Sequence, residues 1–150
     1  MKVTNTHTYG NNADFSMKIW IQLFRSFTKI RAKELKYIQS FDLTMMQFQV
    51  LEVLYHRGDL SVGSITSLTM STPGNITVVV KNLSKDGLIS STKSDKDKRT
   101  SFLCITEKGK EIIENMFPGH AKNFEGYFEV LTDEEKETMF NLLRKLHKSQ

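Results

Sequence analysis

The sequence has little cysteine and no long apolar run. A single cysteine, Cys104, among 150 residues excludes an internal disulfide and is typical of a reducing compartment. No apolar run approaches the length of a membrane span. The first residues, MKVTNTHTYGNNAD, are polar and lack the apolar core of a signal peptide. These absences predict a cytoplasmic protein that does not contact a membrane.

Patterns that indicate catalysis or metal binding are also missing. The chain has no nucleophile–base pair, no Gly-rich phosphate loop and no carboxylate dyad that stands out. The histidines lie far apart, without the spacing of metal ligands, at His7, His56, His120 and His147. We therefore expect no enzyme activity, no cofactor and no metal, and structural or solvated roles for the histidines.

The composition is that of a soluble globular protein, and its charge is unevenly distributed. A hydrophobic content of 39% with 25% charged residues excludes a disordered chain and fits one domain. Residues 1–109 hold 15 Lys and Arg against nine Asp and Glu, whereas residues 110–150 hold six against eight. A basic part joined to an acidic part suits a chain that presents one face to a polyanion.

Helical periodicity and capping signals predict a mainly α-helical fold. A long helix is expected over about 16–39, where apolar residues recur at three- and four-residue steps. Thr44 and Gln47 form a capping box for a second helix, which Gly58 ends. A short helix follows over about 62–68.

The next segment predicts a helix followed by a β-hairpin. Thr72 can cap this helix, Pro73 suits its first position, and Gly87 stops it. The capping signals and the helical spacing of the apolar residues outweigh the strand propensity of its three consecutive valines. Two short strands are expected over about 89–93 and 100–105.

The last part of the chain predicts two more helices. Thr106 begins the first, and we expect Pro118 and Gly119 to kink or interrupt it, because proline removes a backbone donor. The last helix begins with a second capping box, Thr132 and Glu135.

This order of elements is that of a winged helix-turn-helix, whose later helix enters the major groove of DNA. At about 100° per residue, the buried side of that helix carries Ile76, Val79, Val80 and Leu83. Asparagine can pair with adenine, threonine and valine can touch a thymine methyl, and lysine can meet phosphate or guanine. The residues predicted to contact DNA are Thr72, Gly74, Asn75, Thr77, Val78, Lys81, Asn82 and Lys85. The alternative is an ordinary solvated face.

The turn between the two strands holds five consecutive charged residues. A basic hairpin tip beside a recognition helix can enter the minor groove, and we assign that position to Arg99. Asp97 can hold Arg99 extended, and Lys96 and Lys98 can meet phosphates. The alternative is an ordinary charged turn.

The chain resembles the MarR family of transcriptional regulators along nearly its whole length. The matching stretches are LTMMQFQVLEVL, TPGNITVVVKNLSKDGLI, DKDKRTSFLCITEKG and PGHAKNFEGYFEVLTDEEKETMFNLLRKL. Asp97 and Arg99 occupy the family's D-x-R positions, and ITEKG matches its L-T-x-x-G. The family often has arginine at the positions of Val78 and Asn82, so the resemblance does not predict the base preference or the affinity per half-site.

The resemblance implies a repressor that binds a palindromic operator as a homodimer. Residues 1–150 then form one domain, with dimerisation helices at about 15–39 and 107–150 and a winged helix-turn-helix DNA-binding lobe at about 40–106. Apolar stripes at the two chain ends agree with dimerisation; they comprise Trp20, Phe24, Phe27, Met139, Leu142, Leu143 and Leu146.

Three other possibilities follow from the residues and the resemblance. A small apolar or aromatic anion is expected to release the DNA by binding near the first helix, at Trp20, Phe24, Arg25 and Phe27. Cys104 is expected to be inert, with oxidant sensing as the alternative. The alternatives to a DNA-binding regulator are a winged-helix module for protein–protein contact and a ligand-binding protein without a DNA role.

Overall fold

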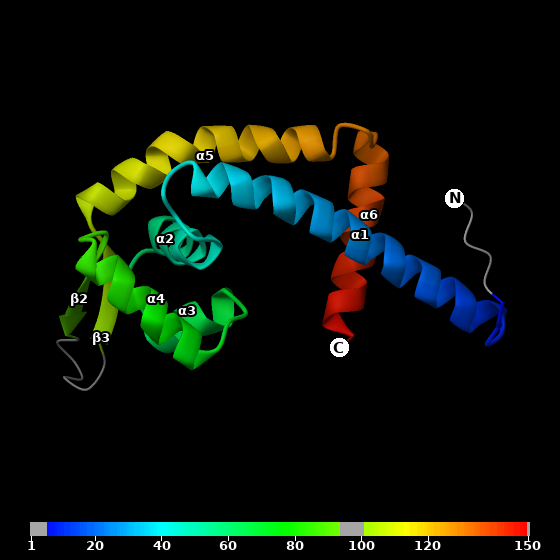
Figure 1. The fold of residues 1–150 in the computed structure, drawn as a ribbon, viewed down its shortest axis with the longest axis horizontal. Coiled ribbons are helices and arrows are strands. Elements are labelled where there is room, and N and C mark those ends of the chain that lie inside the picture. The colour runs from blue at the N-terminus through cyan, green and yellow to red at the C-terminus, as the bar shows by residue number, and fades with distance from the viewer. Residues whose placement is uncertain (1–5, 94–100, 150) are drawn as a thin grey trace.

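Two long helices extend from a lobe of short elements, and the second of them leads to a C-terminal helix (Figure 1). The computed structural model describes residues 6–93 and 101–149. Its elements are α1 (Asn11–Gln39), α2 (Met45–Arg57), β1 (Leu60–Ser61), α3 (Val62–Leu68), α4 (Pro73–Lys85), β2 (Ile89–Lys93), β3 (Ser101–Ile105), α5 (Glu107–Tyr127) and α6 (Asp133–Lys148). We call α2, α3, α4 and the three strands the lobe. None of the helices in these described residues is both long enough and apolar enough to cross a membrane.

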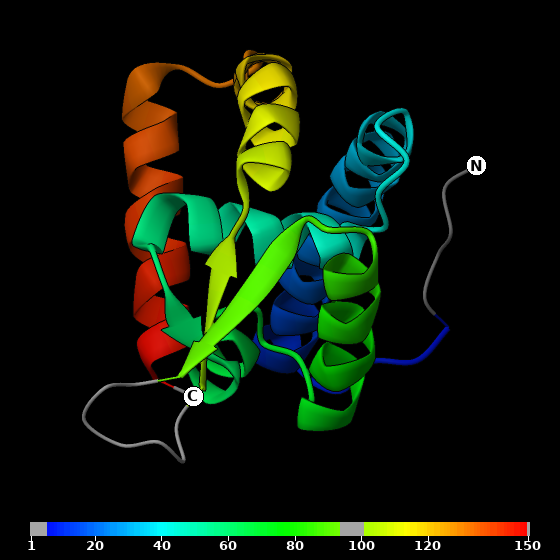
Figure 2. The ribbon, with the colours of Figure 1, turned by 90° about the vertical axis from the view of Figure 1, so that its left-hand side faces the viewer.

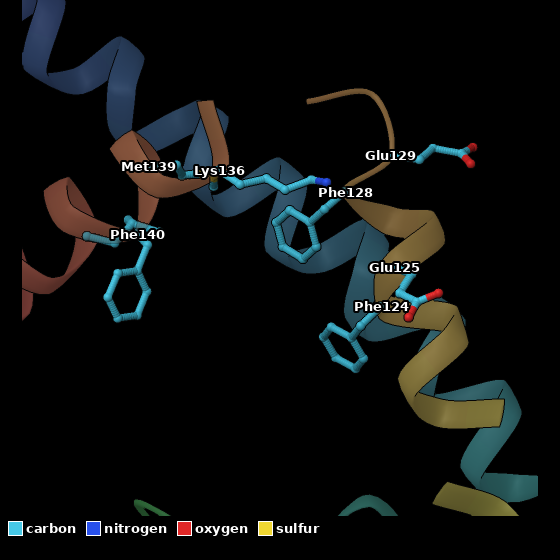
Figure 3. Close-up of a pocket in the computed structure, with 8 residues that line it drawn as sticks. Phe124, Glu125, Phe128, Glu129, Lys136, Met139 and Phe140 are labelled. Carbon is cyan, nitrogen blue, oxygen red and sulfur yellow. The ribbon is translucent and has the colours of Figure 1, made fainter. Parts of the chain in front are cut away.

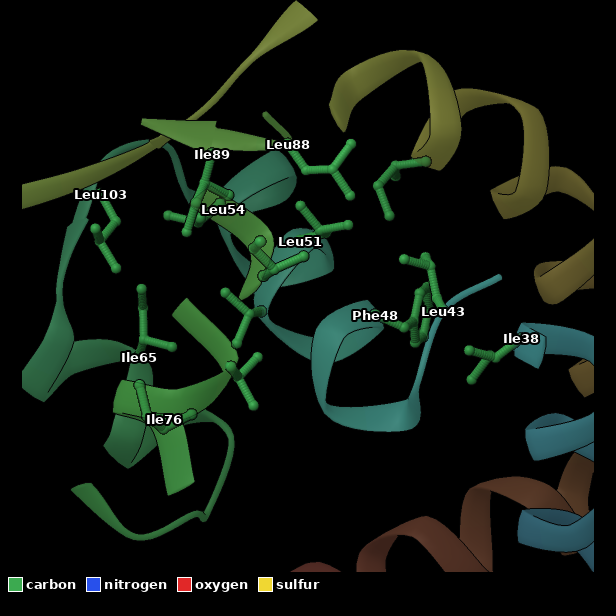
Figure 4. Packing of buried hydrophobic residues seen from close by; sticks show 14 of the residues in the cluster. Ile38, Leu43, Phe48, Leu51, Leu54, Ile65, Ile76, Leu88, Ile89 and Leu103 are labelled. Atoms are coloured by element: carbon green, nitrogen blue, oxygen red, sulfur yellow. The ribbon is translucent and has the colours of Figure 1, made fainter. Parts of the chain in front are cut away.

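The lobe is built on one apolar core (Figure 4). Leu51 and Leu54 of α2, Ile65 of α3 and Leu83 of α4 are almost fully buried in it. The end of α1 and the first half of α5 close the core from the other side. Because five helices and two strands contribute to this core, the positions of the short elements depend on one another.

The predicted helix ends are confirmed. Both capping boxes are present, Thr44 with Gln47 and Thr132 with Glu135. Gly58 follows α2 at φ 79°, a left-handed conformation that favours glycine. Each box satisfies two backbone amides that the first helical turn leaves unpaired.

The capping signals of α4 are also confirmed. The Thr72 hydroxyl accepts a hydrogen bond from the Asn75 amide, and Pro73 is the first residue of the helix. Gly87 follows the helix at φ 71°. The valines at its centre are helical, as the capping signals predict.

Helix α1 begins at Asn11, earlier than the predicted start near residue 16. The Asp14 carboxylate accepts hydrogen bonds from the Thr8 hydroxyl at 2.5 Å and from the Tyr9 amide at 3.0 Å. These bonds lower the pKa of Asp14 and place a negative charge in the first turn, where the helix dipole favours it.

The predicted hairpin is part of a three-stranded antiparallel sheet with the order β1-β3-β2 (Figure 2). The added strand, β1, pairs Leu60 with Leu103 and Ser61 with Phe102. Two residues are too few to show an alternating pattern, so the sequence did not indicate this strand.

Helix α5 continues through Pro118 as one helix, so the chain is not interrupted there, and the kink stays a prediction. Proline removes one intrahelical hydrogen bond, at a cost of about 3 kcal/mol in an isolated helix. Helix α5 contacts α1 beside the proline. The Tyr37 hydroxyl donates to the Met116 carbonyl at 2.7 Å, in space that a Cβ at Gly119 would occupy.

The ITEKG stretch attaches the start of α5 to the end of α4. The Thr106 amide donates to the Leu88 carbonyl at 3.0 Å, and its hydroxyl donates to the Gly87 carbonyl at 2.7 Å. The same hydroxyl accepts from the Gly109 amide at 3.2 Å. A Cβ at Gly109 would overlap the Leu88 carbonyl oxygen, so the backbones approach this closely only because residue 109 is glycine.

Gly109→Ala should therefore lower the free energy of unfolding by about 1–3 kcal/mol, as overpacking does elsewhere. Gly126→Ala is the matched control, because it lies in the same helix with open space around it. The control should be neutral or should gain up to about 1 kcal/mol from higher helix propensity. Urea unfolding measures both, and equal stability of the two variants would contradict the close packing.

Candidate nucleic-acid interface

Helix α4 has one face in the core and one face in solvent. Ile76, Val79 and Leu83 are buried, at the three- and four-residue steps that align them on one side. The residues predicted to contact DNA from this segment are all exposed: Thr72, Gly74, Asn75, Thr77, Val78, Lys81, Asn82 and Lys85. The structure therefore brings them together on one solvent-facing surface.

Short local hydrogen bonds fix the polar side chains at the start of α4. The Asn75 side-chain amide donates to the Ser71 hydroxyl at 3.1 Å, and the Thr77 hydroxyl donates to the Pro73 carbonyl at 2.8 Å. The Asn75 amide has a second N–H and an oxygen, which are the groups that pair with adenine. The N-terminus of the helix favours a phosphate beside them.

The turn between α3 and α4 is also fixed. Thr69 is buried, and its hydroxyl donates to the Ile65 carbonyl at 2.8 Å. Met70 follows with a left-handed φ of 50°, which is uncommon for a residue other than glycine. The Ser71 amide then donates back to the Thr66 carbonyl at 3.1 Å. These contacts hold the two helices at a set angle, as a helix-turn-helix requires.

Strands β2 and β3 run beside α4 in both views of the molecule (Figures 1 and 2). The residues of β2 after Ile89 are polar and exposed up to Lys93. The predicted wing contacts Lys96, Asp97, Lys98 and Arg99 lie outside the described residues. Their roles stay predictions.

Cys104 lies half-buried in β3, opposite Ser90 of β2. Burial is the main cause that raises the pKa of its thiol. The Thr92 hydroxyl at 3.4 Å lowers it in part, and the nearby Asp59 carboxylate raises it again. The thiolate is the reactive form, so these surroundings disfavour oxidation.

The predicted ligand residues are exposed on α1, but they do not share one cavity. Phe24 and Arg25 line a surface hollow of about 610 Å³ together with Lys29. Trp20 and Phe27 are not among the described residues that line it, although the rings of Trp20 and Phe24 are 6.3 Å apart. Because every side chain lining this hollow comes from α1, one chain does not enclose a ligand there.

Two further features were not predicted from the sequence. A groove of about 650 Å³ lies between the end of α5 and α6, with the rings of Phe124, Phe128 and Phe140 around it (Figure 3). A buried carboxylate, Glu34, accepts hydrogen bonds from α5. The Glu34 contacts join segments 86 and 93 residues apart, which hides them in the sequence. The groove depends on how the neighbouring helices α5 and α6 are oriented, which local patterns do not show.

A fixed helix-turn-helix with an exposed polar face, followed by an antiparallel hairpin, defines a winged helix-turn-helix DNA-binding protein. The family model described as "Transcriptional regulator SarA/Rot" matches residues 33–116. The HTH-type transcriptional regulator MhqR of Bacillus subtilis (strain 168) is 34% identical over 131 residues, which are 87% of this chain and 90% of MhqR. The chain belongs to the MarR family of winged helix-turn-helix transcriptional regulators.

Solved structures share the fold. Sco3205, a MarR family transcriptional regulator from Streptomyces coelicolor solved in complex with DNA, is similar at a TM-score of 0.84 and 19% identity, over 97% of this chain and 92% of that one. BpsR of Bordetella bronchiseptica, whose DNA binding is regulated by 6-hydroxynicotinic acid, has a TM-score of 0.77 and 24% identity, over 87% and 98% of the two chains. The predicted fold class and the predicted DNA-binding regulator are confirmed, and neither alternative function is favoured.

The pKa shift of Cys104 predicts the reactivity of its thiol. The alkylation rate of the folded protein should rise with pH at a midpoint above that of the chain unfolded in urea. Each pKa unit by which the folded midpoint exceeds the unfolded one lowers the thiolate fraction at neutral pH roughly tenfold. Iodoacetamide labelling followed by mass spectrometry measures both midpoints. A midpoint at or below that of the unfolded chain would restore Cys104 as a candidate sensor.

Proposed function

We propose that this protein is a homodimeric repressor that binds an inverted-repeat operator with one α4 in the major groove of each half-site. The observation that carries this proposal is the exposed polar face of α4, held opposite its buried face. A two-fold dimer would match half-sites roughly 10 bp apart. A protein bound at an operator blocks access to the promoter without needing a further domain.

Exposed apolar side chains on α1 and α6 support the dimer. Trp20 is 66% exposed and Phe27 is 62% exposed on α1, and Leu142 is 62% exposed on α6. None of the described residues of α6 is buried. Burying one large apolar side chain contributes about 1.5–3 kcal/mol, so a partner that covers these faces gains substantial free energy. The groove between α5 and α6 offers the partner a further apolar surface (Figure 3).

Leu142→Asp should convert the dimer to a monomer, because it places a charge in the proposed interface. Asn141→Asp adds the same charge at the neighbouring exposed position and should leave the dimer intact. Light scattering at micromolar concentration measures both masses. A wild-type protein of monomeric mass would contradict the dimer and, with it, the palindromic operator.

Two substitutions on α4 should separate base reading from phosphate contact. Asn75→Ala should change the sequence preference by about 1–3 kcal/mol at one base pair. Lys81→Ala should weaken all sites alike and reduce the salt slope by about one. Lys145→Ala, on exposed α6, is the control with the same loss of charge. Mobility shifts on the upstream region and on a random DNA pool, at several salt concentrations, measure these effects.

Failure to enrich any sequence from the random pool would contradict specific DNA binding. The wing proposal is tested in the same assay. Arg99 is proposed to enter the minor groove with Asp97 holding it, and Lys96 and Lys98 to meet phosphates, so Arg99→Ala should cost more affinity than Lys96→Ala.

Release by a small apolar or aromatic anion is part of the proposal. BpsR, a structural neighbour, is regulated by such an acid, and the α1 hollow combines Phe24 with Arg25. A ligand there would act only through its different affinities for two dimer geometries. A thermal-shift screen of aromatic acids, followed by operator binding with each hit, tests this part of the proposal.

A further inference from the structure

The turn that joins α3 to α4 has the backbone hydrogen bonds of a Schellman motif. The Ser71 amide donates to the Thr66 carbonyl at 3.1 Å, and the Met70 amide donates to the Ser67 carbonyl at 3.2 Å. In this motif, the first residue after the helix cap adopts a left-handed conformation and is usually glycine. Here that residue is Met70, with a φ of 50°.

Methionine is poorly suited to this backbone conformation, because a Cβ in the left-handed region crowds the following carbonyl oxygen. The other residues with a positive φ, among those that the structure describes, are Gly10, Asp42, Gly58 and Gly87. Glycine has no Cβ, and aspartate tolerates the left-handed region better than most residues do. Met70 is therefore the position of the five at which the residue type fits the backbone least.

The side chain of Met70 contributes nothing to the core that would explain its presence. It is 88% exposed, which is the largest exposure of any large apolar side chain in the described part of the chain. The backbone stays in place because its neighbours fix it, with Thr69 buried and its hydroxyl bonded to the Ile65 carbonyl at 2.8 Å. A strained residue that its surroundings hold in place is characteristic of functional sites.

Met70 adjoins the surface of α4 that is proposed to contact DNA. The next residue, Ser71, accepts a hydrogen bond from the side-chain amide of Asn75 at 3.1 Å, and Thr72 caps the helix. When the first turn of α4 lies in the major groove, its side chains face base edges and its N-terminus faces a phosphate. A residue just before this turn then lies beside the sugar-phosphate backbone that borders the groove.

We propose that Met70 is a further DNA-contacting residue, whose side chain packs on the deoxyribose of the DNA backbone at the edge of each half-site. A thioether side chain is unbranched and flexible, so it can follow an irregular apolar surface. It carries no charge to neutralise a phosphate, whereas the sugar offers C–H surface. Contacts with the backbone position the protein and carry no sequence information. This inference rests on the proposed binding of α4 in the major groove.

Three substitutions separate the side chain of Met70 from its backbone conformation. Met70→Gly removes the side chain and suits the left-handed region, and Met70→Asn suits this region but is polar. Met70→Leu keeps an apolar side chain of similar size together with the poor backbone fit. Fluorescence anisotropy of the full chain on its operator measures the affinity of each variant.

Met70→Gly and Met70→Asn should each lose about tenfold in operator affinity, as expected if one apolar side chain is partly buried in each half-site. Met70→Leu should stay within about threefold of the wild type, because a swap that conserves volume is tolerated best. The loss should be the same at every salt concentration, since methionine releases no counterion. The base preference selected from a random DNA pool should not change.

Thermal unfolding supplies a readout of the opposite sign. Met70→Gly should raise the unfolding midpoint by about 2–4 °C, because it relieves the left-handed methionine. The variant would then be the more stable protein and the weaker DNA binder. Asp42→Gly is the matched control, because Asp42 has a φ of 58° in the turn between α1 and α2. It should lose no operator affinity.

Wild-type affinity in both Met70→Gly and Met70→Asn would overturn this inference while leaving the proposed function intact. An equal loss in Met70→Leu would also overturn it, because the apolar side chain would then not be what matters. A changed salt slope or base preference would overturn the sugar contact. A wild-type protein that enriches no DNA sequence would defeat the proposed function and this inference together. If Met70→Gly does not fold, the comparison of Met70→Asn with Met70→Leu decides the question.

Discussion

Burial of one face of α4 is the interaction on which the DNA-binding surface depends. Ile76, Val79 and Leu83 pack against α2 and α3, and this packing turns the polar residues of the same helix to solvent. Just after α4, the close backbone contacts of Thr106 and Gly109 with Leu88 fix the chain that leaves the helix. A recognition surface needs this rigidity, because a base contact survives errors of only a few tenths of an ångström.

The rest of the chain is organised differently. The lobe buries its apolar side chains, whereas α1 and α6 expose many of theirs. Helix α6 has polar residues in its first turn and an exposed apolar stripe after them. A helix of this kind is stable in water only with a partner for its apolar face. The same chain therefore combines a lobe that satisfies its own core with helices that expose apolar faces, and this combination supports the proposed symmetric dimer.

Local signals in the sequence were sufficient for the elements whose ends are set by neighbouring residues. Thr44 with Gln47, and Thr72 with Pro73, act within one turn, so their roles are visible in the sequence. Strand β1 was not visible in the sequence, because it forms only by pairing with residues more than 40 positions away. The hydrogen bond of Tyr37 on α1 to Met116 on α5 joins residues 79 positions apart, so the sequence did not indicate it either. Exposure on α4 followed from periodicity, whereas the wing contacts stay predictions.

The cluster of Glu34, His120 and Tyr127 illustrates why buried polar contacts escape sequence analysis. Glu34 is 86 residues from His120 and 93 residues from Tyr127 in the sequence. Its position has a geometric consequence. At 1.5 Å per residue, roughly 20 Å of α1 separates Glu34 from Trp20, so a rotation of a few degrees at this cluster moves Trp20 relative to the lobe by about 2 Å. That displacement exceeds the tolerance of a hydrogen bond to a base. In the proposed dimer, the two α4 helices would therefore match two half-sites together only if α1 and α5 meet at the same angle in both subunits.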